Sequence, residues 1–179
     1  MTLNPLHLLF RPRGRLDRPS FAVALVLFLL VSALATWILR ALDPATAAGF
    51  WFGLVWFLLF FYMLYSVFGQ RLHDMGRSVW PLTGLLFALF LLFISVAMAY
   101  GGAEYMSEYS QFDRKEVIDP STVERLDETY RTELAAGGER TLRWGSKLLA
   151  GAFTLWLLVW PGQAGENRYG GAAGASNPA

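Results

Sequence analysis

The chain has no cysteine and little charge, and both shortages narrow its functional class. Without cysteine among its 179 residues, it forms no disulfide, holds no metal through thiolates and offers no cysteine nucleophile. Charged residues make up only 16% and the formal net charge is +1, so composition gives no general attraction to nucleic acid. Hydrophobic residues make up 55%, which is too many for an ordinary soluble domain and indicates a membrane protein.

Familiar catalytic and metal-binding patterns are also missing from the sequence. There is no Gly-x-Ser-x-Gly, no His-Glu-x-x-His and no phosphate-binding loop, so no catalytic residue is assigned and an enzyme is disfavoured. His73 and Asp74 lack a third ligand at metal-binding spacing, and His7 is distant in sequence. We therefore predict no metal and no other cofactor.

Three uncharged runs are long enough to cross a bilayer as helices. They cover residues 21–39, 50–68 and 82–100, and at about 1.5 Å per residue each reaches about 28 Å. None carries an ionisable group in its core, which disfavours ion-coupled transport. Basic residues before the first run are also typical of a signal peptide, but the further spans favour an uncleaved first span.

A fourth run, residues 148–160, is short for a transmembrane helix. Extending it back to about 144 lets Lys147 reach the headgroups and gives a span of about 144–160. A re-entrant or interfacial helix is the alternative. We therefore predict an all-α polytopic membrane protein with four transmembrane helices and an inserted amphipathic helical loop between the third and fourth.

Arginines near the span ends predict the orientation. Four precede the first span and two lie between the second and third: Arg11, Arg13, Arg15, Arg18, Arg71 and Arg77. Positive charge favours the cytoplasmic side, so we predict that both termini are cytoplasmic. Residues 1–100 then hold the N-terminal segment and the first three spans, 101–147 form an extracytoplasmic loop, and 148–179 hold the fourth span and a cytoplasmic tail.

The long loop contains a predicted amphipathic helix. Its apolar residues recur at helical spacing: Val123, Leu126, Tyr130 and Leu134. Asp127 and Arg131 can pair at i,i+4, and Gly137-Gly138 is expected to break the helix before a second one leads into the fourth run. We expect the apolar face to rest on the membrane surface, with a partner-binding helix as the alternative.

Three polar motifs stand beside the spans. They are Gly14-Arg15-Leu16-Asp17-Arg18, Arg71-Leu72-His73-Asp74-Met75-Gly76-Arg77-Ser78 and Pro161-Gly162-x-x-Gly165-x-Asn167-Arg168-Tyr169-Gly170. Asp74 can pair with Arg71 or Arg77, so a tight turn with internal ion pairs is one interpretation of the second motif. In the functional interpretation, the two arginines clamp a phosphate or carboxylate and His73 is a donor or proton carrier.

In order and placement these motifs resemble the domain of unknown function 805 family of small bacterial inner-membrane proteins. The resemblance covers residues 10–80 and 148–170. Val79-Trp80-Pro81 replaces the aromatic pairs that usually follow the serine, and residues 101–147 look like an insertion in a usually short connection. The resemblance implies a location in the bacterial inner (plasma) membrane and supports the polar cluster, but it implies no substrate.

The predicted topology places all three motifs on one side of the membrane, where their polar side chains are expected to converge. The candidate ligand-binding residues are Arg15, Arg18, Arg71, His73, Asp74, Arg77, Asn167 and Arg168. The leading hypothesis is a non-catalytic membrane module whose cationic pocket binds anionic lipid headgroups or a partner's acidic segment. The alternatives are a small transporter or channel component and a membrane enzyme acting on lipid phosphate. Four short spans enclose little interior, which favours a homo-oligomer or a membrane-protein partner.

Overall fold

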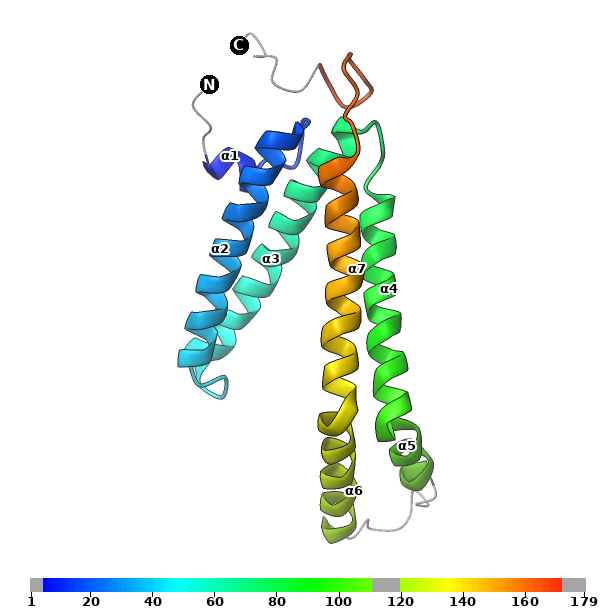
Figure 1. Cartoon of the computed structure of the whole chain (residues 1–179). Helices are drawn as coiled ribbons and strands as arrows, with labels where there is room; N and C mark the ends of the chain where they lie inside the picture. Colours follow the sequence, from blue (N-terminus) through cyan, green and yellow to red (C-terminus); the bar gives the residue numbers. More distant parts are fainter. Residues whose placement is uncertain (1–4, 111–119, 172–179) are drawn as a thin grey trace. The chain divides into compact units, whose positions relative to one another are not determined.

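The computed structural model describes residues 5–110 and 120–171, and the regular elements in these ranges are helices (Figure 1). Three helical stretches are long and apolar enough to cross a membrane: α2 (Arg18–Ala41), α3 (Ala47–Asp74) and Trp80–Ser107, which begins with α4 (Trp80–Ala97). They contain the first three predicted spans. The all-α class and the membrane-like character of these helices are therefore confirmed.

The chain divides into two compact units. The first, residues 1–83 and 154–179, holds α1 (Pro5–Phe10), α2, α3, the start of α4 and the end of α7 (Glu139–Val159). The second unit, residues 84–153, holds the rest of α4 and α7. Between α4 and α7 lie η1 (Met98–Gly102), α5 (Ala103–Ser110), α6 (Pro120–Glu133) and η2 (Leu134–Gly138). Element η2 is a π-helical turn, whereas η1 contains a kink.

The first unit is built on α2 and α3, which lie side by side (Figure 1). Asp17 begins α2, where its side chain accepts the N–H of Ser20 at 3.0 Å and the following proline suits the first turn. The two helices pack through aromatic rings: Phe21 lies 5.6 Å from Phe68, and Phe28 lies 5.3 Å from Phe60. Their outward faces stay apolar and exposed, as a helix facing lipid requires.

Helix α3 continues through half of the second motif, which the sequence had placed in a loop. It ends at Asp74, and burial continues to that end, with Leu72 fully buried and Asp74 only 3% exposed. The end is a Schellman motif. Gly76 donates to His73 O at 3.0 Å, and Arg77 donates to Leu72 O at 2.8 Å. Gly76 has φ +71°, a left-handed conformation that glycine adopts without strain.

In the second unit, Gly137-Gly138 does not break the helix, so that expectation was wrong. The π-helical turn η2 connects α6 to α7 without interruption. The ring of Tyr100 packs against these glycines, and a Cβ on Gly137 would lie only 2.6 Å from it. The hydroxyls of Tyr100 and Thr141 are hydrogen-bonded at 2.9 Å. The chain kinks instead near Gly101, where φ is +91°.

The apolar face of α6 packs within the second unit. Leu126 is buried, and the ring of Tyr130 lies 5.8 Å from that of Tyr105 on α5. The predicted Asp127–Arg131 pair forms at 2.8 Å on the exposed side. Contacts with α5 and η1 therefore cover part of this face of α6, and its contact with the membrane surface stays a prediction.

Helix α7 is not one of the three long apolar helices. It includes residues 148–159 of the predicted fourth span, but Arg140, Arg143 and Lys147 occupy the turns before them. The structure therefore establishes three such helices among the described residues, where the sequence predicted four spans.

Candidate functional site

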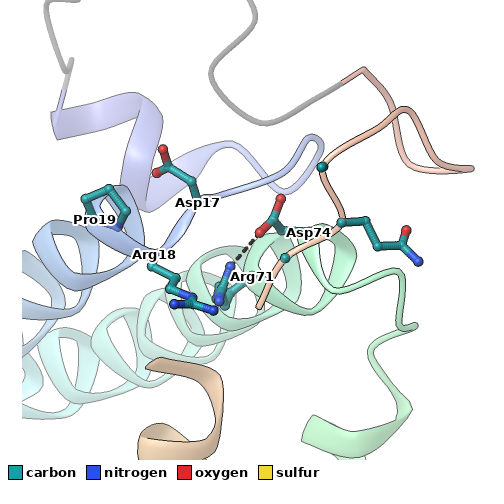
Figure 2. Close-up of a pocket in the computed structure, with 8 residues that line it drawn as sticks. Asp17, Arg18, Pro19, Arg71 and Asp74 are labelled. Atoms are coloured by element: carbon teal, nitrogen blue, oxygen red, sulfur yellow. Dashed lines mark hydrogen bonds and ion pairs between the residues drawn. The ribbon is translucent and has the colours of Figure 1, made fainter. Parts of the chain in front are cut away.

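Arg71 and Asp74 form a buried ion pair at the end of α3. Arg71 Nη1 donates to Asp74 Oδ2 at 2.5 Å, and the two side chains are 0% and 4% exposed (Figure 2). A charged side chain that is buried away from water is tolerated only where it is paired with an opposite charge and hydrogen-bonded. This is one of the two pairings that the i,i+3 spacing predicted. The other does not form, because the Arg77 guanidinium lies over the Trp156 ring at 5.3 Å.

The remaining donors of Arg71 cap the end of α7. Its Nε donates to Leu157 O at 2.8 Å and its Nη2 to Trp160 O at 2.6 Å. The last carbonyls of a helix lack intrahelical partners and carry a partial negative charge, which a guanidinium satisfies. Nη1 also reaches Leu16 O at 3.3 Å. Arg71 thus joins the N-terminal segment, α3 and α7.

Arg15 is the second buried guanidinium, with a side chain only 1% exposed. Its Nε and Nη2 both donate to Asp74 Oδ1, at 3.2 and 3.1 Å. Its other bonds go to backbone carbonyls: Nη1 donates to Gly165 O at 2.6 Å and to Gly171 O at 3.2 Å, and Nη2 donates to Gln163 O. Two buried guanidinium groups therefore share one carboxylate.

The chain passes directly over Asp74 as it leaves α7. The backbone N–H of Gln163 donates to Asp74 O at 2.8 Å. A Cβ on Gly162 would overlap the Asp74 carboxylate, so no larger residue fits there without displacing it. This close approach explains the glycine after the helix-ending proline.

Residues 161–171, which we name the C-terminal strap, are fastened to α3 at a second point. Asn167 Nδ2 donates to His73 O at 2.9 Å. The Tyr169 ring stacks on the His73 ring, with centroids 4.0 Å apart and planes at 11°. The Arg168 guanidinium lies 4.7 Å from the centre of the Tyr169 ring. The third motif therefore docks on the second.

A cavity of about 290 Å³ opens beside this cluster (Figure 2). Its lining residues are Asp17, Arg18, Pro19, Arg71, Asp74, Gly162, Gln163 and Ala164. Arg18 is exposed, and its Nε donates to Trp160 O at 3.3 Å, the oxygen that also accepts from Arg71. Within the described ranges, the two terminal nitrogens of Arg18 have no hydrogen-bond partner, so they are open to an oxyanion.

The structure brings all eight candidate residues to this end of the first unit. Arg15, Arg71 and Asp74 bond directly, and Arg18 shares an acceptor with Arg71. Of the eight, Arg18, Arg71 and Asp74 line the cavity. The others do not: Arg77 lies over Trp156, and His73, Asn167 and Arg168 belong to the second attachment of the strap. Sequence reasoning missed Gln163, Trp160 and Tyr169, which act through backbone atoms or a ring. Their position within or beside the third motif was the available signal. Among the described residues, no three His, Asp or Glu side chains are grouped to hold a metal ion.

Comparison with known proteins supports the resemblance seen in the motifs. A family model described as Protein of unknown function (DUF805) matches residues 9–171. No curated protein and no solved structure matches the chain. The matched range contains all three motifs.

Proposed function

The chain belongs to the DUF805 family, and from this membership and the geometry above we propose that it holds an anionic phospholipid headgroup as a non-catalytic integral membrane protein. The three long apolar helices support the membrane assignment. The open guanidinium of Arg18 beside a cavity supports headgroup binding.

The contacts of Arg15 support a four-span topology, because residues that bond to each other must be separated by an even number of membrane crossings. Arg15 bonds both to Asp74 and to Gly165, so these residues lie on the same side of the membrane. An even number of crossings must separate each pair. Helices α2 and α3 supply two crossings before Asp74. If Trp80–Ser107 crosses, α7 must cross back, with Lys147 extending toward the headgroups.

Charge supports a cytoplasmic location for the cluster in a bacterial inner membrane. Segments 11–18, 70–78 and 160–171 carry seven arginines against three acidic residues: Arg11, Arg13, Arg15, Arg18, Arg71, Arg77 and Arg168, with Asp17, Asp74 and Glu166. The turn between α2 and α3 is flanked by one of each sign, Arg40 and Asp43. An excess of arginine favours the cytoplasmic side, which supports the proposal that both termini are cytoplasmic.

The position and chemistry of Arg18 favour a phospholipid phosphate. Arg18 is the first residue of α2, and the apolar run begins at Phe21, so its guanidinium stands at the level of the headgroups. A phosphate oxygen accepts strong charge-assisted bonds from guanidinium, and each cation near an anionic surface contributes about 1 kcal/mol. Because Asp17 and Asp74 also line the cavity, a singly charged phosphodiester suits it better than a dianion.

We expect Arg18→Gln to lower the amount of phosphatidylglycerol retained by the purified protein at least about tenfold, since a charge-assisted bond is worth about 1.5–3 kcal/mol. Native mass spectrometry of protein extracted from defined bilayers measures the retention. Arg40→Gln, the same substitution at the other end of α2, is the matched control and should retain lipid normally. Equal retention by the two variants would refute the proposal.

A further inference from the structure

The C-terminal strap is attached by polar bonds and one ring stack, with no apolar core of its own. None of residues 161–171 is buried; only Asn167 and Tyr169 are even half-buried. A segment with so few buried apolar contacts opens at low free energy compared with the helices it rests on. The strap is therefore the part of the first unit best suited to move.

The strap offers the Arg15 guanidinium only uncharged acceptors, its backbone carbonyl oxygens. Three of its carbonyls, those of Gln163, Gly165 and Gly171, accept from this guanidinium, and only Asp74 supplies a negative charge. A phosphate oxygen carries a formal negative charge and a backbone carbonyl oxygen only a partial one, so the electrostatic attraction of the Arg15 guanidinium to a phosphate is the stronger. An oxyanion would also balance the second buried guanidinium, which shares its carboxylate with Arg71.

The cavity brings such an anion next to the strap. Gly162, Gln163 and Ala164 line it together with Arg18. Gln163 is also one of the three residues whose carbonyl Arg15 binds. A phosphate held by Arg18 thus reaches the strap at the point where Arg15 is engaged.

We propose that strap docking and phosphate binding compete for Arg15, so that an anionic headgroup entering the cavity releases the C-terminal strap. This inference rests on the proposed function, because it names the regulation of the same site. The coupling is reciprocal: the anion loosens the strap, and a loosened strap binds the anion more tightly. The C-terminal strap would then report the lipid composition around the protein.

Hydrogen exchange of the full chain in nanodiscs tests the release. We expect the amides of residues 162–171 to exchange about tenfold faster in phosphatidylglycerol discs than in phosphatidylcholine discs, because the phosphate offers Arg15 a full negative charge in place of carbonyl dipoles. The turn at residues 42–50 is the internal reference, because its capping bonds lie at the opposite end of α2 and α3. Equal strap exchange in both lipids, while phosphatidylglycerol is retained, overturns the strap inference alone.

A variant at the far attachment of the strap tests reciprocity. Tyr169→Ala removes the ring stack on His73 without touching Arg15 or Arg18, and should retain several-fold more phosphatidylglycerol than the wild type. Lower retention would mean that the strap builds the site rather than covering it, and would overturn the inference. Glycerophosphoglycerol, the soluble phosphodiester of the same headgroup, separates the sources when it is added to phosphatidylcholine discs: strap release there assigns a soluble phosphodiester, and release by phosphatidylglycerol alone assigns the lipid. If the wild-type protein extracted from phosphatidylglycerol discs retains none of this lipid, the proposed function itself is rejected.

Discussion

The buried guanidinium of Arg71, near the C-terminal end of the apolar helix α3, donates hydrogen bonds to four oxygens, which compensate its charge. One belongs to Asp74, and the others are backbone carbonyls of Leu16, Leu157 and Trp160. The arrangement explains why an arginine is needed at this position. Its planar fork offers five donors in fixed directions, whereas a lysine offers three on one nitrogen.

Asp74→Asn is expected to lower the stability of the protein by about 3–5 kcal/mol, because it leaves two buried guanidinium groups without their shared counter-charge. Unfolding followed by circular dichroism in detergent measures the change. Asp127→Asn removes the carboxylate of an exposed pair and should cost no more than about 0.5 kcal/mol. Equal losses in the two variants would show that the burial of Asp74 has no energetic weight.

Sequence reasoning reached some of these residue contacts and not others. The Arg71–Asp74 pair could be predicted because three residues separate its members on a helix. The Arg15–Asp74 bond joins residues 59 apart, and the stack of Tyr169 on His73 also crosses most of the chain. No local pattern encodes such partners, so topology predicted only that their segments meet.

At the scale of secondary-structure elements, the hydrophobic runs predict where the long helices lie but not where they end. Runs of nineteen uncharged residues gave three helices correctly, because lipid requires that length. The end of α3 was missed because Gln70 and Arg71 are polar, and they are buried by segments distant in sequence. The absence of a break at Gly137-Gly138 was missed because a ring on another helix fills that space.

Gly76→Ala tests the end of α3. It forces a side chain into the left-handed region at a cost of about 1–2 kcal/mol, and the Gln163 side chain must move to make room. The midpoint of thermal unfolding in detergent should therefore fall. Gly84→Ala is the control, because a Cβ added at this position in α4 would meet no atom within 4 Å. This variant should leave the unfolding midpoint unchanged or raise it. A fall in both variants would point to a general intolerance of alanine.

At the scale of the whole molecule, the absence of cysteine makes the topology directly testable. Single cysteines at Ser78, Ser110 and Ser176 can be labelled in intact cells with a membrane-impermeant thiol reagent. We expect labelling at Ser110 alone, since the proposed four crossings would put the other two positions in the cytoplasm. Labelling at Ser176 as well would mean that α7 does not cross, and it would contradict the parity argument.

The bond between Arg15 and Gly165 also has a consequence for biosynthesis. Its two residues are 150 positions apart, so at about 5–20 residues per second the ribosome needs roughly 8–30 s to supply the partner. During that wait Arg15 lacks its strap partners and carries its charge at the membrane surface, where arginines direct the insertion of a nascent chain. In the proposed topology, the same side chain first helps to orient the nascent chain during membrane insertion, and afterwards binds the C-terminal strap in the folded protein.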